Sequence, residues 1–441
     1  MPAVDRQGLA LSGVTSEAAG LFDEASLGFL CYHGDPIGLV KQALADNPDF
    51  AMGYLFMAAL NLSGMEPAGI ARGSRMLEKA AAVSLNDREA AHLAAYRALA
   101  KGQFTASLVE LEGLLLDWPR DVLALQMAQL LDFYRGDARN LRDRVARRLP
   151  AWSREDVNYH GVLGLHAFGL EECAAYREAE ERGQEAVGLQ PLNAWAVHAV
   201  AHVYEMEARS EAGIAWLRGT QEGWTDQNFF QVHNWWHLAL CHLERDEPEA
   251  ALALYDGPVL AAWNKVVLEL TDAASLLWRL MLRDADVGDR WEKVGSAWIP
   301  FVEQDVHAFN DVHAVMTFAA LGWEKELNAL LERMRATAES GGGDNAAMQR
   351  LVGLPLSEGL MAYARGDYRA CIEALVDLRS PAQHFGGSHA QRDLIDLTLL
   401  EAAKRAGDQR RLKALTAERQ SLRPDSGWVR RYLAGLDSAA A

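Results

Sequence analysis

The sequence predicts an all-α fold built from stacked helical hairpins, and three observations lead to this prediction. From Leu21 onward, apolar residues recur at spacings of three and four, which is the period of one helix face. Runs that alternate apolar and polar residues, the pattern of half-buried strands, are nearly absent. The 13 prolines stand mostly between helical segments rather than inside them, where they would break a helix.

Helix boundaries repeat along the chain at a nearly constant step. Pro48, Pro119 and Pro191 each open a helical segment, and their separations are 119 − 48 = 71 and 191 − 119 = 72 residues. This step is about twice the roughly 34 residues of a two-helix tetratricopeptide repeat. We therefore predict a tetratricopeptide-like α-solenoid, in which helix-turn-helix repeats curl into a superhelix. The intermediate repeats are expected to begin near Ser84, Glu155 and Asp226.

The same pattern gives an expected domain organisation. Residues 1–20 are polar and weakly patterned, so we expect a polar N-terminal segment that forms a loop or a short helix. Residues 21–441 keep the helical period almost throughout and are expected to form a single tetratricopeptide-like superhelical domain. Within this domain, Gly102 and Gly366 are expected to end first helices, because the turn after a helix favours glycine.

The composition argues against several classes of protein. With 43 basic and 61 acidic residues the formal charge is 43 − 61 = −18, so we expect no nucleic-acid partner. No uncharged apolar run reaches the roughly 18 residues of a membrane helix, and the N-terminus lacks the pattern of a secretory signal. We therefore expect no membrane association and a cytoplasmic location. The four cysteines form no Cys-x-x-Cys pair and are expected to be buried free thiols: Cys31, Cys173, Cys241 and Cys371.

Two consecutive first helices carry histidine pairs at the same repeat position. Counting seven and eleven residues past the repeat start at position 191 leads to His198 and His202. The same count from the next repeat start, at position 226, leads to His233 and His237. Residues four apart share one helix face, and equivalent positions of neighbouring first helices lie side by side in a solenoid. The register therefore predicts that the four imidazoles converge on one patch of the concave surface.

This histidine patch is the main candidate for a functional site. His-x-x-x-His on one helix face is a ligand spacing for zinc and other borderline divalent metals. The four histidines are therefore expected to bind a metal or to act as catalytic acids and bases. Glu205, one turn beyond His202, is expected to serve as a carboxylate ligand or base. The zinc motif His-Glu-x-x-His is absent, so a second interpretation stays open, in which the histidines only form hydrogen bonds across the groove.

Further polar residues are candidates for the same site. Counting back eleven residues from Gly322, which ends another first helix, leads to Asp311, a candidate catalytic carboxylate that orients an imidazole. His313, two residues on, is a candidate substrate-binding residue, as are His160 and Asn234. Each has a structural alternative, since a buried histidine or asparagine also needs a hydrogen-bond partner within the fold.

Arg392 and Asp393 are the last candidates. They lie in the first turns of a helix for which Ser388 is the expected N-cap. The Arg392 guanidinium is expected to bind a substrate carboxylate or phosphate, with Asp393 as its orienting partner. The alternative is an ordinary pair at a helix start, where the helix dipole favours an acidic residue.

Six short stretches resemble the tetratricopeptide repeat protein 38 family. They contain unusual polar residues, occur in the family's order and span roughly residues 155 to 425, whereas the part before about 120 matches less distinctly. The resemblance implies an all-helical tetratricopeptide-like superhelix and brings no established reaction. His389 is not carried into the site, because position 389 is not part of the motif. The stretches are residues 156–161, 194–206, 233–240, 309–313, 352–356 and 386–393.

Two functional hypotheses from different classes remain. In the first, a histidine-rich concave pocket binds a small molecule, and transforms it if the protein is a metal-dependent or histidine acid–base hydrolase or lyase, with a divalent metal such as zinc as the cofactor. In the second, the superhelix is a scaffold that binds a peptide in its groove. Rows of lysine or arginine facing the groove would favour the scaffold. The expected groove positions are His, Trp, Asn and Asp instead, so the sequence favours the small-molecule pocket.

Overall fold

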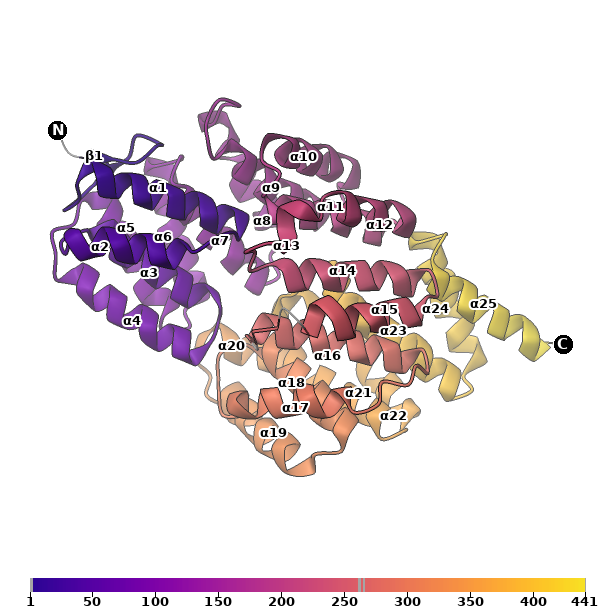
Figure 1. Ribbon diagram of the computed structural model, residues 1–441. Coiled ribbons are helices and arrows are strands. Elements are labelled where there is room, and N and C mark those ends of the chain that lie inside the picture. Colours follow the sequence, from indigo (N-terminus) through magenta and orange to yellow (C-terminus); the bar gives the residue numbers. More distant parts are fainter. Residues whose placement is uncertain (1–2, 261–262, 265, 441) are drawn as a thin grey trace. The chain divides into compact units, whose positions relative to one another are not determined.

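The computed structural model describes residues 3–260, 263, 264 and 266–440, with side chains described up to residue 434. Nearly all regular structure in these residues is helical, which confirms the all-α prediction (Figure 1). The chain folds into two compact units, residues 1–200 with 220–230 and residues 201–219 with 231–441. Helix α11 (Ala194–Met206) runs through the boundary and contributes to both units.

The first unit begins with a small antiparallel hairpin in which Ala3 pairs with Leu11. Helix α1 starts at Ser16, capped by the Thr15 side chain, so the helical region begins within the segment predicted to be polar. Its elements are β1 (Ala3–Val4), β2 (Ala10–Leu11), α1 (Ser16–Cys31), α2 (Pro36–Asp46), α3 (Ala51–Ser63), α4 (Pro67–Ala81), α5 (Asp87–Leu99), α6 (Phe104–Asp117), α7 (Val122–Tyr134), α8 (Ala138–Ala146), η1 (Leu149–Ala151), α9 (Tyr159–Glu171), α10 (Tyr176–Leu189), the first part of α11, and α13 (Glu222–Thr225).

The second unit contains the remaining helices. It consists of the last part of α11, α12 (Ser210–Gly219), α14 (Gln231–Glu244), α15 (Pro248–Leu254), η2 (Tyr255–Val259), α16 (Val267–Leu282), α17 (Arg290–Trp298), η3 (Ile299–Phe301), α18 (Ala308–Leu321), α19 (Glu324–Glu339), α20 (Gly343–Met348), η4 (Gln349–Gly353), α21 (Leu354–Ala364), α22 (Tyr368–Leu375), η5 (Pro381–Phe385), α23 (His389–Arg405), α24 (Gln409–Leu422) and α25 (Gly427–Ala440).

The repeat pattern predicted from the prolines is present in both units. Consecutive helices pack as hairpins, such as α3 with α4 and α9 with α10 in the first unit, and α16 with α17 and α21 with α22 in the second. First helices of successive hairpins also pack on one another, including α7 on α9 and α14 on α16. Each unit is therefore an array of tetratricopeptide-like helical hairpins. The first helices α3, α5, α7, α9 and α11 begin three or four residues after the predicted repeat starts, at Ala51, Asp87, Val122, Tyr159 and Ala194.

The turn inside several hairpins uses a left-handed residue, as predicted at Gly102 and Gly366, whose φ angles are 71° and 78°. Glycine reaches this region without strain, which explains its place after a first helix. The four cysteines are free thiols, and all but the half-buried Cys173 are buried. Among the described residues, no helix combines the length and the apolar character needed to cross a membrane. A single domain over residues 21–441 stays a prediction.

Candidate functional site

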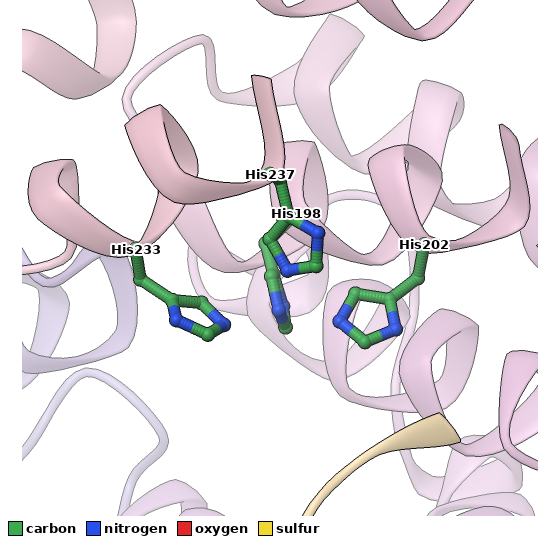
Figure 2. Close-up of side chains that lie close together, drawn as sticks. All are labelled: His198, His202, His233 and His237. Carbon is green, nitrogen blue, oxygen red and sulfur yellow. The ribbon is translucent and has the colours of Figure 1, made fainter. Parts of the chain in front are cut away.

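The two predicted histidine pairs come together. His198 and His202 lie one turn apart on α11, and His233 and His237 lie one turn apart on α14. One ring nitrogen from each of the four lies within 4.8 Å of the others, and Figure 2 shows the four imidazoles directed toward one another. Three of them lie in the second unit. His198 stands in the part of α11 assigned to the first unit, and the continuous helix places it on the same face as His202.

The histidines are in ring contact and shielded from solvent. The ring centroids of His202 and His237 are 4.5 Å apart, and those of His233 and His237 are 4.8 Å apart with perpendicular planes. Each of the four histidines is at most 5% exposed. Four imidazoles buried this closely can bind one metal ion through ring nitrogens that carry no proton.

Two carboxylates orient two of the imidazoles. Nδ1 of His237 lies 2.9 Å from Oε2 of Glu205, and Nδ1 of His233 lies 2.9 Å from each oxygen of Asp272. A carboxylate oxygen accepts hydrogen bonds, so each Nδ1 carries the hydrogen and donates it. In the neutral imidazole the lone pair then lies on Nε2, the atom that can bind a metal. A carboxylate that holds Nδ1 in this way is the usual support of a metal-binding histidine.

The electrostatics of these groups also favour a bound cation. Burial raises the pKa of Glu205 to about 7 and raises the pKa of Asp272, although the nearby histidines act in the opposite direction. Burial also lowers the pKa of His237 well below its ordinary value, helped by the neighbouring histidines and Arg279. Burial thus opposes the negative charge of both carboxylates and the positive charge of His237. A divalent cation would stabilise the carboxylates and leave the imidazoles neutral.

Trp236 and residues of α16 surround the cluster within the second unit. The indole of Trp236 stacks on His233 at 5.2 Å with an interplanar angle of 13°, and its Nε1 donates to Ser275 Oγ at 2.9 Å. The guanidinium of Arg279 lies 5.4 Å from the centroid of the same indole. These contacts hold Trp236 and His233 in place on one side of the site.

The predicted carboxylate Asp311 has other partners. Its two oxygens accept hydrogen bonds from Arg333 and Gln349, which ties α18 to α19 and η4. Burial raises the pKa of Asp311 to about 6. The contacts that orient imidazoles of the cluster come from Glu205 and Asp272 instead.

The predicted histidines outside the cluster are engaged by local partners. Nδ1 of His313 donates to the carbonyl of Phe309 at 2.8 Å, and burial lowers its pKa to about 4. In the first unit, Nδ1 of His160 accepts from the side-chain amide of Asn193 at 3.0 Å, and Asn193 caps α11 by accepting from the backbone N–H of Ala196. His160 therefore supports the helix that carries His198 and His202.

Asn234 differs from the other candidates because its side chain is fully buried, at 0% exposure. Within the described part of the chain, neither its amide nitrogen nor its carbonyl oxygen has a hydrogen-bond partner. A buried amide normally forms hydrogen bonds, so this side chain is consistent with the predicted contact to a ligand.

The Arg392 and Asp393 pair is used within the fold. Ser388 caps α23 in a capping box with Gln391, as the sequence predicts. The Arg392 guanidinium donates to the backbone carbonyls of Gly386 and Gly387. Asp393 accepts from Arg419 at 2.7 and 3.0 Å and from Arg423 at 3.2 Å.

Sequence reasoning missed two residues beside the cluster, Asp272 and Arg279. A signal for the first exists, since His233 contacts Asp272 and Trp236 contacts Ser275 at the same separation of 39 residues. This separation is close to one repeat, so α16 is the next first helix after α14. Continuing the repeat count past α14 would have indicated Asp272.

Comparison with known proteins finds helical repeat structures. No family model matches the chain. Among solved structures, the chain is similar to the tetratricopeptide repeat domain of P58(IPK), with 14% identity, 89% of this chain and 98% of that chain covered, and a TM-score of 0.20. It is also similar to the pentatricopeptide repeat protein PPR10 from maize, with 11% identity, 94% and 69% covered, and a TM-score of 0.26. With TM-scores this low, neither likeness bears on what this chain binds.

Proposed function

We propose that this protein binds one divalent metal ion, with zinc as the best fit, and uses it to bind and transform a small molecule. The observation that carries the proposal is the pairing of His233 with Asp272 and of His237 with Glu205. Each carboxylate fixes the hydrogen on Nδ1 and so places the lone pair of the imidazole on Nε2. The convergence of four ring nitrogens within 4.8 Å distinguishes these histidines from His242, which contacts Glu247 outside the cluster. We also propose, from the six motif stretches, that the chain is a member of the tetratricopeptide repeat protein 38 family.

The ligands that fit best are His202, His233 and His237. In tetrahedral zinc sites the Zn–N distance is about 2.0–2.1 Å, which places ligand nitrogens roughly 3.3–3.4 Å apart. One ring nitrogen of each histidine lies within 4.8 Å of the others, so each pair of nitrogens would have to approach by about 1.5 Å at most to reach this range. His198, whose ring packs on Trp195 at 5.1 Å and Phe230 at 5.0 Å, then stays outside the coordination and takes the role of acid and base.

Three neutral imidazoles leave one position of a tetrahedral metal for water or substrate. This ligand set is typical of catalytic zinc, which lowers the pKa of bound water to about 7 and supplies a nucleophile at neutral pH. Glu205 and Asp272 would hold two ligand rings in place and offset the charge of the ion. Hydrolysis or reversible hydration is therefore the reaction class that we propose.

The peptide scaffold is less well supported. A peptide that lies in a groove contacts exposed side chains, whereas His202 and His237 are fully buried. The acidic net charge of −18 also argues against a nucleic-acid partner, because the phosphate backbone is negatively charged. The burial of these side chains therefore favours a small ligand over a peptide.

Metal analysis tests the proposal. The full chain, purified without chelator or histidine tag, is expected to contain about one equivalent of metal by elemental mass spectrometry, and a His202→Ala/His237→Ala double variant is expected to lose nearly all of it. His242→Ala is the matched control, because His242 lies on the same helix and contacts Glu247. It should retain the metal. A wild-type chain that contains no metal and binds no added Zn²⁺ or Co²⁺ would overturn the proposal.

A further inference from the structure

Arg279 is a buried cation on α16 beside the histidine cluster. Its side chain is among the largest that are fully enclosed, and the residue is 2% exposed. The guanidinium donates to the backbone carbonyl of Ser275 at 3.2 Å and to those of Ala390 and Gln391 at 2.7 and 3.5 Å. A guanidinium has five N–H donors, so these three contacts leave donors available.

The charge of Arg279 has no direct counter-ion among the residues that the structure describes. Within the described residues, no carboxylate oxygen lies within 4.0 Å of its nitrogens, in contrast to the buried Arg144 and Arg419, which contact Asp132 and Asp393. The acids that act on Arg279 from a longer distance include Glu205, Asp272 and Asp393, and all three already have partners. Buried arginines are normally paired, because an unpaired buried charge is strongly destabilising.

The position of Arg279 links it to the proposed site. Its guanidinium lies over Trp236, whose ring contacts His237 at 4.8 Å and stacks on His233. An anion bound to Arg279 would therefore lie beside the metal ligands.

We propose that Arg279 binds the anionic group, a carboxylate or a phosphate, of the small molecule on which the metal centre acts. This inference rests on the proposed function. The planar guanidinium suits an oxyanion because it can donate two parallel hydrogen bonds to it. The substrate class is thus a small oxyanion whose reactive group reaches the open position of the metal. Arg392, the residue that the sequence suggested for this role, is occupied by the carbonyls of Gly386 and Gly387.

Calorimetric titration of the full chain with inorganic phosphate and with acetate tests this inference. Both anions are titrated into zinc-loaded and chelator-treated samples. The zinc-loaded wild type is expected to bind at least one of them, and Arg279→Gln is expected to weaken that binding by about 10- to 100-fold, the range for a lost hydrogen bond to a charged group. The anion that binds more tightly identifies the group carried by the substrate.

Arg283→Gln is the matched control. Arg283 lies four residues further along, at the C-cap of α16, and is also buried, but it contacts the carboxylate of Asp246. Its substitution is expected to leave anion affinity unchanged. If Arg279→Gln does not fold, as judged by circular dichroism, the Arg279→Lys variant is used for the test instead. This variant keeps the positive charge but loses the planar guanidinium that can donate two parallel hydrogen bonds. A several-fold weaker affinity in Arg279→Lys supports the inference.

The outcomes separate this inference from the proposed function. Equal anion affinity in wild type and in the Arg279 variants, or no binding of either anion, overturns the role of Arg279 even if metal is present. Anion binding that depends on Arg279, in a chain that is purified without metal and takes up no added Zn²⁺, would instead retain the anion site and overturn the metal centre. Metal content is measured on the same samples, so each result is assigned to one of the two proposals.

Discussion

At the scale of single residues, the histidines were predictable and their carboxylate partners were only partly so. The two His-x-x-x-His pairs follow from repeat register, which depends on spacing alone. Glu205 follows from its place on the same helix. Continuing the repeat count indicates Asp272 as a candidate, but its contact with His233 depends on how α14 packs on α16, which spacing alone does not give. Arg279 gave no sequence signal, since an arginine within a helix is ordinarily at the surface.

The carboxylates provide a test at this scale. Asp272→Asn and Glu205→Gln are each expected to weaken metal affinity by about 10- to 100-fold, because each variant removes the acceptor that orients an imidazole and raises its basicity. Affinity is measured by competition with a chromophoric chelator. Asp311→Asn serves as the control, since Asp311 contacts Arg333 and Gln349, and it should leave metal affinity unchanged. A loss in Asp311→Asn without a loss in Asp272→Asn would restore the sequence-based assignment.

At the scale of elements, the prolines and small residues predicted where the first helices begin, because they act locally. The places where the repeat departs from its period were not predictable in this way. The π-helical segment η2 contains Pro258 and, at Gly257, a non-helical ψ of −105°. There the chain departs from a regular hairpin between α15 and α16. A proline removes one backbone hydrogen bond, but the geometry that replaces it is set by the packing around it.

Close helix packing gives a prediction for glycines in the first unit. A Cβ atom at Gly169 on α9 would lie less than 3.0 Å from the backbone of Leu141 and Arg142, whereas a Cβ at the exposed Gly188 on α10 would meet nothing within 4 Å. Gly169→Ala is therefore expected to destabilise the fold by about 1–3 kcal/mol through overpacking. Gly188→Ala is expected to stabilise it by up to about 1 kcal/mol through helix propensity. Urea unfolding midpoints measure both, and a neutral Gly169→Ala would show that α8 and α9 can separate without cost.

At the scale of the whole molecule, buried titratable groups act on stability in opposite directions. Between pH 6.5 and 4, histidines that stay neutral in the fold become protonated on unfolding, so stability is lost as the pH falls. Buried carboxyls with raised pKa values become protonated in the folded state before they do in the unfolded chain. They therefore make the folded state more stable as the pH falls over the same range. Burial lowers the pKa of His160, His166 and His313 to about 4 and raises that of Asp5, Asp132 and Asp311 to about 6.

The opposing contributions predict a shallow pH dependence for the wild-type protein, and removing one histidine should reveal its share. His160→Gln keeps an acceptor for the Asn193 amide but cannot take up a proton. The contribution of His160 is fully present above its unfolded pKa of 6.5 and is lost as the pH falls toward its folded pKa of about 4. Relative to its own stability at pH 7.5, the variant should therefore be more stable than wild type at pH 4.5, by at most about 2–3 kcal/mol. Urea midpoints across this range measure the difference. Parallel curves for the two proteins would mean that His160 takes up its proton as readily in the fold as in the unfolded chain, despite the amide that donates to its Nδ1.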